Sequence, residues 1–253
     1  MLTPKPDFYD VTINGHFSAL VGLPPVHRDH EPLAIIAHGR DSSARSPHIE
    51  KIYNAYLDLG FRVVVPNLRN SDWNDSPGCK KDFTIAAHVD DTRATIEWAR
   101  MEFGYDCFAM AGHSMGGFST CYLAATEYRD QTSHILAVSP FTSGVRAILA
   151  RQNSDNHPDG LENMDREMPA ALEEWPQWSI YPYIENLTMP VSVIAGGADT
   201  ITTPQDMEFF AGGLPLCVDY RIVEGAKHLM EDGQEEFDYT ELIRRLEGHK
   251  LHR

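Results

Sequence analysis

Residues 108–120 read FAMAGHSMGGFST, an apolar run in which Ser114 stands between glycines at positions 112 and 116. Glycines weaken strands and helices, so this spacing indicates something other than regular structure. The apolar residues before the serine are typical of a buried strand, and residues 117–128 favour a helix. A serine raised on a sharp strand-to-helix turn needs small neighbours two positions away on each side. We therefore predict that Gly112-His113-Ser114-Met115-Gly116 is a nucleophile elbow, with His113 as a packing or hydrogen-bonding neighbour. The alternative is an ordinary turn.

Strands and helices are expected to alternate along the chain. Residues 8–24 read as two strands joined by Asn14-Gly15, a strong hairpin signal. Amphipathic spacing predicts helices near 85–99 and 239–246, and another over 48–59 that stops at Gly60. This order predicts an α/β fold whose sheet is mostly parallel and doubly wound, preceded by an antiparallel hairpin. The apolar runs expected to form the later strands are residues 33–37, 62–66, 107–111, 134–138, 191–195 and 218–223.

One connection is too long to be a plain loop. We expect a single domain over residues 1–253, in which residues 143–183 form a small helical cap inserted between two strands. The aromatic residues of this segment make Trp175, Trp178 and Tyr181 candidates for substrate binding. The alternative is a set of surface helices whose aromatic side chains simply pack on the domain.

A serine hydroxyl needs a base to become a nucleophile near neutral pH, and the base needs an orienting acid. Asp199 follows the strand expected at 191–195, and His228 follows the last strand. Because the carboxyl ends of parallel strands meet at one edge of a sheet, Ser114, Asp199 and His228 are expected to lie together. The alternative for Asp199 is a helix cap or turn residue.

The same chemistry needs donors for a developing oxyanion. The backbone N–H of Met115 is one candidate because it follows the serine directly. Gly39, after the strand expected at 33–37, lets the backbone turn toward the serine, so the N–H of Arg40 is the second candidate. The alternative is a tight turn without such a role.

These pieces together resemble the α/β-hydrolase superfamily over nearly the whole chain. The matching motifs are the His38-Gly39 loop, the elbow, the GGADTITTP loop (196–204) and the GAKHL loop (225–229). Within the superfamily the chain is similar to esterase and lipase branches, including hydroxycinnamoyl esterases and monoacylglycerol lipases. The resemblance implies Ser114 as nucleophile, His228 as general base and then acid, and Asp199 as its orienting partner. Asn67 and Asn70 stand where many of these relatives carry aspartate and glycine, which leaves the subfamily open.

The composition and net charge of the chain argue against several classes of binding partner. The formal net charge of −16 argues against nucleic acid and against anionic membrane surfaces, and no apolar stretch is long enough to insert into a bilayer. The N-terminus lacks signal-peptide character and the four cysteines stand singly, so we expect a cytoplasmic location. Residues 27–31 (HRDHE) lack metal-ligand spacing and are expected to form a polar loop. We expect neither a metal nor an organic cofactor, and the sequence leaves the oligomeric state open.

The sequence therefore predicts a serine hydrolase that cleaves a small-molecule carboxylic ester through an acyl-enzyme. A thioester, an amide or a carbon–carbon bond can be cleaved with the same three residues. A receptor on this fold would bind a small molecule tightly without turnover, and an acyltransferase would react faster with an added alcohol than with water. Covalent labelling of Ser114 by a fluorophosphonate would argue against the receptor.

Overall fold

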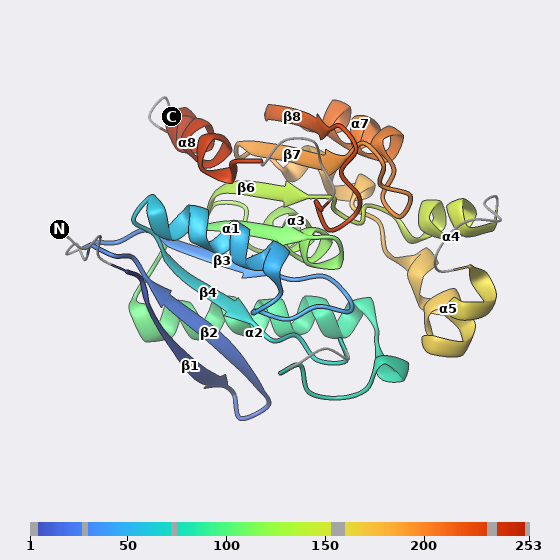
Figure 1. The fold of residues 1–253 in the computed structure, drawn as a ribbon, viewed down its shortest axis with the longest axis horizontal. Helices are drawn as coiled ribbons and strands as arrows, with labels where there is room; N and C mark the ends of the chain where they lie inside the picture. Colours follow the sequence, from blue (N-terminus) through green and yellow to red (C-terminus); the bar gives the residue numbers. More distant parts are fainter. Residues whose placement is uncertain (1–4, 27–29, 72–74, 153–159, 232–236, 251–253) are drawn as a thin grey trace.

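The computed structural model describes residues 5–26, 30–71, 75–152, 160–231 and 237–250. In this part of the chain, eight strands form one sheet in the order β1-β2-β4-β3-β5-β6-β7-β8 (Figure 1). The first two pairings, β1 with β2 and β2 with β4, are antiparallel, and the others are parallel. The predicted mostly parallel sheet with an N-terminal hairpin is confirmed. The strands are β1 (Asp7–Ile13), β2 (Phe17–Leu23), β3 (Leu33–Ala37), β4 (Arg62–Pro66), β5 (Phe108–His113), β6 (Thr132–Val138), β7 (Val191–Gly196) and β8 (Cys217–Val223).

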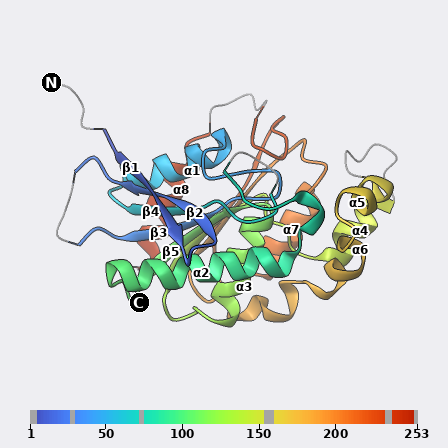
Figure 2. The ribbon, with the colours of Figure 1, turned by 90° about the horizontal axis from the view of Figure 1, so that it is seen from below.

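Helices cover both faces of this sheet, as the doubly wound prediction requires (Figure 2). Successive strand residues point to opposite faces, so Ile35 packs in one core layer and Ile36 in the other. Both side chains are fully buried, which explains why the β3 sequence is apolar throughout. The layer with Ile36 lies under α1 (Pro47–Asp58) and α8 (Tyr239–Lys250), and the layer with Ile35 lies under α2 (Ile85–Phe103), α3 (Met115–Thr126) and α7 (Pro204–Gly213).

Local signals set the ends of these elements. The hairpin turn uses Asn14 and Gly15, both at positive φ (51° and 72°), the conformation that a tight two-strand turn requires. The side chain of Thr84 accepts a hydrogen bond from the N–H of Ala87 at 3.1 Å and starts α2. Gly104 ends α2 in the left-handed region (φ 73°).

The segment between β6 and β7 holds several short helices. Figure 1 shows α4 and α5 beyond the carboxyl ends of the central strands. In the region predicted as a cap, residues 153–159 lie outside the described residues, and the role of this segment as a cap stays a prediction. Its elements are α4 (Gly144–Gln152), α5 (Leu161–Glu167), α6 (Ala171–Glu174) and the 3₁₀ turns η2 (Trp175–Gln177) and η3 (Tyr181–Asn186); a further 3₁₀ turn, η1 (Lys80–Asp82), precedes α2.

The sequence predicts that no segment inserts into a membrane and that residues 27–31 form a polar loop. No helix in the described ranges combines the length and the apolar character that crossing a membrane requires. Of the polar stretch 27–31, residues 27–29 lie outside the described residues.

Candidate active site

Ser114 lies between the last residue of β5 and the first residue of α3. Its backbone has φ 54° and ψ −119°, a conformation that side-chain-bearing residues rarely adopt. The Ser114 N–H donates to the carbonyl of Val138 at 3.0 Å, and its own carbonyl accepts from the N–H of Phe118 at 3.0 Å. The sharp strand-to-helix turn expected around Ser114 is therefore present, and neighbouring backbone holds it in its strained shape.

The glycines around this turn stand where backbone segments touch. A Cβ atom on Gly112 would lie 2.4 Å from the carbonyl carbon of Gly116. One on Gly116 would lie 2.1 Å from the carbonyl oxygen of Ala37, and one on Gly39 would lie 2.9 Å from Cβ of Ser114. Real Cβ atoms essentially never lie closer than 3.0 Å to another heavy atom, so each glycine permits an approach that a larger residue would block.

Three side chains from three strand ends form one hydrogen-bonded chain. Ser114 Oγ lies 3.0 Å from His228 Nε2, and His228 Nδ1 lies 2.8 Å from Asp199 Oδ2. These residues follow β5, β8 and β7, so the parallel sheet gathers them at its carboxyl edge. A carboxylate only accepts hydrogen bonds, so the tautomer of His228 that fits this chain carries its proton on Nδ1 and leaves Nε2 to accept from the serine hydroxyl.

Asp199 is buried, and the loop after β7 satisfies both of its oxygens. Oδ1 accepts from the backbone N–H of Ile201 at 2.8 Å and of Thr202 at 3.0 Å. Oδ2 accepts from the Thr202 hydroxyl at 2.9 Å in addition to His228. Burial by itself raises the pKa of a carboxyl, but His228 and these donors outweigh it and hold the pKa of Asp199 below its usual value. Asp199 is therefore an anion fixed beside the imidazole.

His113 holds the other side of the His228 loop. Its Nε2–H donates to the backbone carbonyl of His228 at 2.8 Å, which confirms its expected place as a hydrogen-bonding neighbour. The rings of His48 and His228 lie 4.7 and 4.8 Å from the ring of His113. Burial, and then the proximity of these two histidines, lowers the pKa of His113 well below its ordinary value. His113 is thus a neutral donor that fixes the loop.

The loop after β3 runs beside the serine, as the contact of Gly39 with Ser114 shows. His38 Nδ1–H donates to the carbonyl of Gly39 at 2.7 Å, and His38 Nε2 accepts from the N–H of Leu68 at 2.9 Å. Burial lowers the pKa of His38 to about 4, so this imidazole stays neutral and keeps both hydrogen bonds. Met115 opens α3, where a backbone N–H has no acceptor within its own helix.

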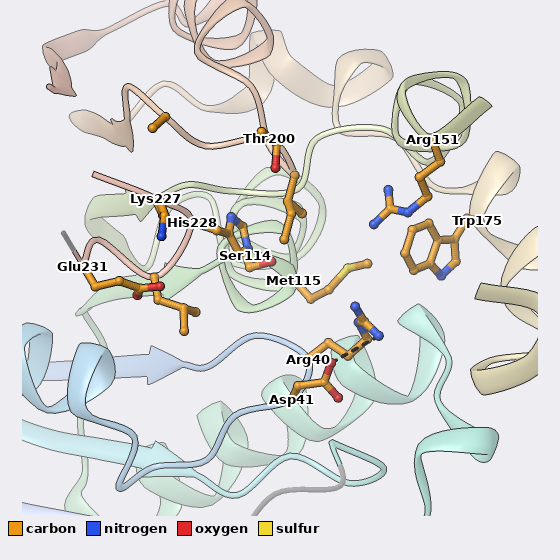
Figure 3. Close-up of a pocket in the computed structure, with 13 residues that line it drawn as sticks. Arg40, Asp41, Ser114, Met115, Arg151, Trp175, Thr200, Lys227, His228 and Glu231 are labelled. Carbon is orange, nitrogen blue, oxygen red and sulfur yellow. Dashed lines mark hydrogen bonds and ion pairs between the residues drawn. The ribbon is translucent and has the colours of Figure 1, made fainter. Parts of the chain in front are cut away.

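Ser114 and His228 open into a cavity of about 470 Å³, a size typical of small-molecule sites. Trp175 lines this cavity, together with Arg40, Met115 and Arg151 (Figure 3). The other two aromatic candidates lie elsewhere in the segment. Trp178 packs edge-on against Phe118 and Tyr122, and Tyr181 packs against Phe209 and donates to the Thr142 hydroxyl. Neither is among the side chains that line the cavity.

Similarity to known proteins identifies the family of this chain. The sequence model of the alpha/beta hydrolase fold matches residues 32–167, more than half of the chain. This chain belongs to the α/β-hydrolase family. Its fold is similar to that of ferulic-acid-bound Est1E from Butyrivibrio proteoclasticus, with a TM-score of 0.75 and 21% identity over 96% of this chain and 98% of that one. It is also similar to a thermophilic esterase from Thermogutta terrifontis, with a TM-score of 0.65 and 19% identity over 96% and 99% of the two chains.

Among curated proteins, this α/β hydrolase is similar to "Putative esterase YheT" from Escherichia coli (strain K12). The two are 26% identical over 106 residues, which make up 42% of this chain and 31% of that protein. The match therefore spans about a third of the length of that relative.

The structure of this α/β hydrolase explains one departure from the family pattern. Asn70, where many relatives carry glycine, has a φ of 62°, and asparagine tolerates that region better than most residues. Its side chain accepts from the N–H of Cys79 at 3.1 Å and donates to the carbonyl of Asp82 at 2.9 Å. The asparagine therefore adopts a left-handed backbone conformation, and its side chain links the two ends of the loop before α2.

Two residues lie within the quoted motifs of this α/β hydrolase, but sequence reasoning gave their side chains no role. Thr202 bonds Asp199 through both its N–H and its hydroxyl. His38 orients the loop beside Ser114. The signal for Thr202 was a hydroxyl residue three positions after the acid, a spacing that places it in the same turn.

Proposed function

We propose that this α/β hydrolase is a serine hydrolase that cleaves a small-molecule carboxylic ester through an acyl-enzyme. The observation that carries the proposal is the hydrogen-bonded chain from Ser114 through His228 to Asp199, with Ser114 at the wall of a 470 Å³ cavity. Nucleophile, base and orienting acid stand in the order and at the distances that acyl transfer requires. Membership of the α/β-hydrolase family supports the same reaction class.

Acylation begins when Ser114 Oγ attacks the ester carbonyl and its proton passes to His228 Nε2. The imidazolium is stabilised by Asp199, whose carboxylate is held ionised by its donors. The negative charge on the former carbonyl oxygen is met by the backbone N–H groups of Met115 and Arg40. The tetrahedral intermediate collapses, the C–O bond to the alcohol breaks, and His228 returns its proton to the leaving oxygen.

Deacylation repeats these steps with water. His228 Nε2 takes a proton from a water molecule, the resulting hydroxide attacks the acyl carbon, and the bond to Ser114 Oγ breaks. His228 gives its proton back to the serine, and the carboxylic acid leaves. Because His228 must be unprotonated at the start of both halves, protonation of this imidazole stops the reaction, and kcat/KM should fall as the pH is lowered.

The test uses a panel of nitrophenyl esters from acetate to palmitate, beside methyl hydroxycinnamates. The Ser114→Ala variant should lose at least about three orders of magnitude in kcat, because the remaining groups supply only residual catalysis. Ser133→Ala is the matched control. Ser133 lies at the amino end of β6, whereas Ser114 lies at the carboxyl edge of the sheet, so this variant should keep full activity. A fluorophosphonate should transfer its phosphonyl group to Ser114 Oγ with loss of fluoride, and the peptide with Ser114 should gain the mass of that group. A folded wild type that neither turns over these esters nor takes up the label would contradict the proposal.

A further inference from the structure

A chain of ion pairs joins the loop after β3 to the segment between β6 and β7. Asp41 Oδ2 lies 3.2 Å from Arg40 Nη1 at the wall of the cavity (Figure 3). Asp41 Oδ1 lies 3.2 Å from Lys80 Nζ, and Lys80 Nζ lies 2.6 Å from Glu167 Oε2. Lys80 belongs to η1 and Glu167 to α5, so three elements that are distant in sequence meet at one ammonium group.

The backbone of Asp41 needs support from its side chain. Its φ of 56° lies in the left-handed region, which costs energy for a residue with a side chain. Asp41 directly follows Arg40, whose backbone N–H is the proposed second donor to the oxyanion. On the other side of this donor, Gly39 rests against Ser114, and His38 donates to the Gly39 carbonyl. The loop is thus held by close packing and a hydrogen bond before the donor and by ion pairs after it.

Lys80 is the cation that Asp41 and Glu167 share. Only 21% of its side chain is exposed. Burial by itself lowers the pKa of an ammonium group, but Glu167 and Asp41 outweigh it and raise the pKa of Lys80 above its usual value. Lys80 is therefore charged near neutral pH. Without this charge the two carboxylates would face each other and repel, and the loop after β3 would move relative to α5.

We propose that Lys80 is a positioning residue for ester hydrolysis: it fixes Asp41, and through Asp41 the N–H of Arg40, at the place where the oxyanion forms. This inference rests on the proposed ester hydrolysis. Glu167 holds the ammonium group from α5, so the position of α5 is coupled to the loop that supplies the donor. The oxyanion exists in the transition state and not in the bound ester, so loss of Lys80 lowers kcat and leaves KM nearly unchanged.

The first experiment measures kcat and KM of Lys80→Gln with 4-nitrophenyl butyrate. Removing an oxyanion donor outright costs about 10²- to 10³-fold in kcat, so a displaced donor should cost about tenfold, with KM within about twofold of the wild type. Lys81→Gln is the matched control, because Lys81 is exposed on the same 3₁₀ turn and the variant loses the same charge. Its kcat and KM should equal those of the wild type.

A transition-state analogue tests the oxyanion itself. Trifluoromethyl propyl ketone carries the carbons of the butyryl group. Ser114 Oγ adds to its carbonyl carbon, the serine proton passes to His228, and the carbonyl oxygen becomes an anion. The inhibition constant should rise about tenfold in Lys80→Gln, in parallel with the fall in kcat, whereas a smaller folded fraction would leave it unchanged. Lys80→Arg keeps a cation between the two carboxylates and should restore most of both values.

Variants of the two carboxylates test the rest of the ion-pair chain. Asparagine also tolerates the left-handed region, so Asp41→Asn keeps the backbone preference and weakens the ion pairs, and kcat should fall about as far as in Lys80→Gln. Glu167→Gln should lower kcat less, because Lys80 keeps Asp41, and it should lower kcat no further when added to Lys80→Gln. Glu162→Gln, exposed on α5, is the control for Glu167→Gln. If Lys80→Gln does not fold, kcat and the ketone inhibition constant of Asp41→Asn and Glu167→Gln decide the question.

Failure of the inference and failure of the proposed function look different. If Lys80→Gln keeps the wild-type kcat and inhibition constant, the positioning role is overturned while ester hydrolysis stands. A raised KM with an unchanged kcat also overturns it, because Lys80 would then act on substrate binding. An equal loss in Lys81→Gln overturns it as an effect of net charge alone. If folded wild type turns over neither the butyrate nor any other ester of the panel, the proposed function fails and the inference falls with it.

Discussion

Gly116 is the residue where the elbow comes closest to the neighbouring strand. A Cβ at this position would lie 2.1 Å from the carbonyl oxygen of Ala37 and 2.5 Å from that of His38. Backbone atoms cannot move aside cheaply, so Gly116→Ala should lower the free energy of unfolding by about 2 kcal/mol or more. Displacing Ala37 and His38 would also move the Gly39–Arg40 loop away from Ser114. We therefore expect a loss of ester hydrolysis beyond the loss of stability, measured by urea unfolding and by activity well below the unfolding midpoint.

Gly212→Ala provides the matched control for this change. Gly212 lies in α7, and a Cβ there would meet nothing within 4 Å. Because alanine favours a helix over glycine by about 1 kcal/mol, this variant should be as stable as the wild type or slightly more so. Equal stability of the Gly116 and Gly212 variants would show that the elbow relaxes more easily than its contacts indicate.

Thr202 acts on the site through Asp199. Its hydroxyl lies 2.9 Å from Asp199 Oδ2, the oxygen that also faces His228. Thr202→Val keeps the shape and the backbone donors but removes this hydroxyl, so we expect kcat to fall about tenfold. With one donor fewer, the Asp199 carboxylate becomes a stronger hydrogen-bond acceptor and stabilises the imidazolium form of His228 more. The acid limb of the kcat/KM profile should therefore move to higher pH. Thr202→Ser should restore both kcat and the profile, whereas a purely structural defect would leave the limb in place.

The three residues of the hydrogen-bonded chain could be found from the sequence because each carries a local signal. Ser114 is flanked by glycines, and Asp199 and His228 each follow an apolar run that forms a strand. His38, which orients the loop beside Ser114, carries no such signal. His38 is a single histidine among twelve, and its two hydrogen bonds depend on the side-chain rotation that β3 and the loop after β4 impose.

At the scale of elements, Glu174 links the segment between β6 and β7 to the N-terminus of α2. Its carboxylate accepts from the backbone N–H of Ile85 and of Ala86, both at 2.9 Å, and these open α2. An anion at a helix N-terminus is favourable because of the helix dipole and the unbonded N–H groups there. Glu174→Gln should therefore lower the free energy of unfolding by about 1 kcal/mol, and the loss should shrink in high salt.

The adjacent Glu173 offers the control, since it lies on the same short helix and is exposed. Glu173→Gln makes the same charge change and should leave stability within about 0.5 kcal/mol of the wild type. Limited proteolysis should also cut the 143–183 segment faster in the Glu174 variant alone. Identical behaviour of the two variants would mean that the α2 contact contributes nothing measurable.

The elements themselves were largely predictable, and the reason is their periodicity. β3 and β4 occupy the predicted ranges 33–37 and 62–66, because apolar runs of that length suit only buried strands here. The segment after β6 was harder. Its short helices are stabilised by contacts with distant parts of the chain. Glu174, for example, bonds the N–H groups of Ile85 and Ala86, which precede it by 89 and 88 positions, and no local sequence pattern indicates such contacts.

At the scale of the whole molecule, neutral histidines are concentrated in the interior around the site. Burial lowers the pKa of His38 and of His48 to about 4, with nearby histidines adding to the effect at His48. Burial likewise holds the pKa values of His88 and His113 well below the ordinary 6.5. Between pH 6.5 and 4, the unfolded chain therefore binds protons at positions where the folded chain binds none. The stability that these groups confer is complete above pH 6.5 and is lost as the pH falls toward 4.

This coupling predicts a steep loss of stability on mild acidification. Each such histidine lowers the free energy of unfolding by about 1.4 kcal/mol per pH unit below 6.5, and most carboxyl groups are still ionised in both states down to about pH 5. His88 bonds the Ser71 hydroxyl through Nε2 at 3.2 Å, outside the reacting chain, so His88→Gln should make the slope shallower by about one proton. Urea unfolding at pH 7.0, 6.0 and 5.5 measures the slope; a free energy of unfolding that is constant over this range would mean that these histidines are protonated in the folded protein.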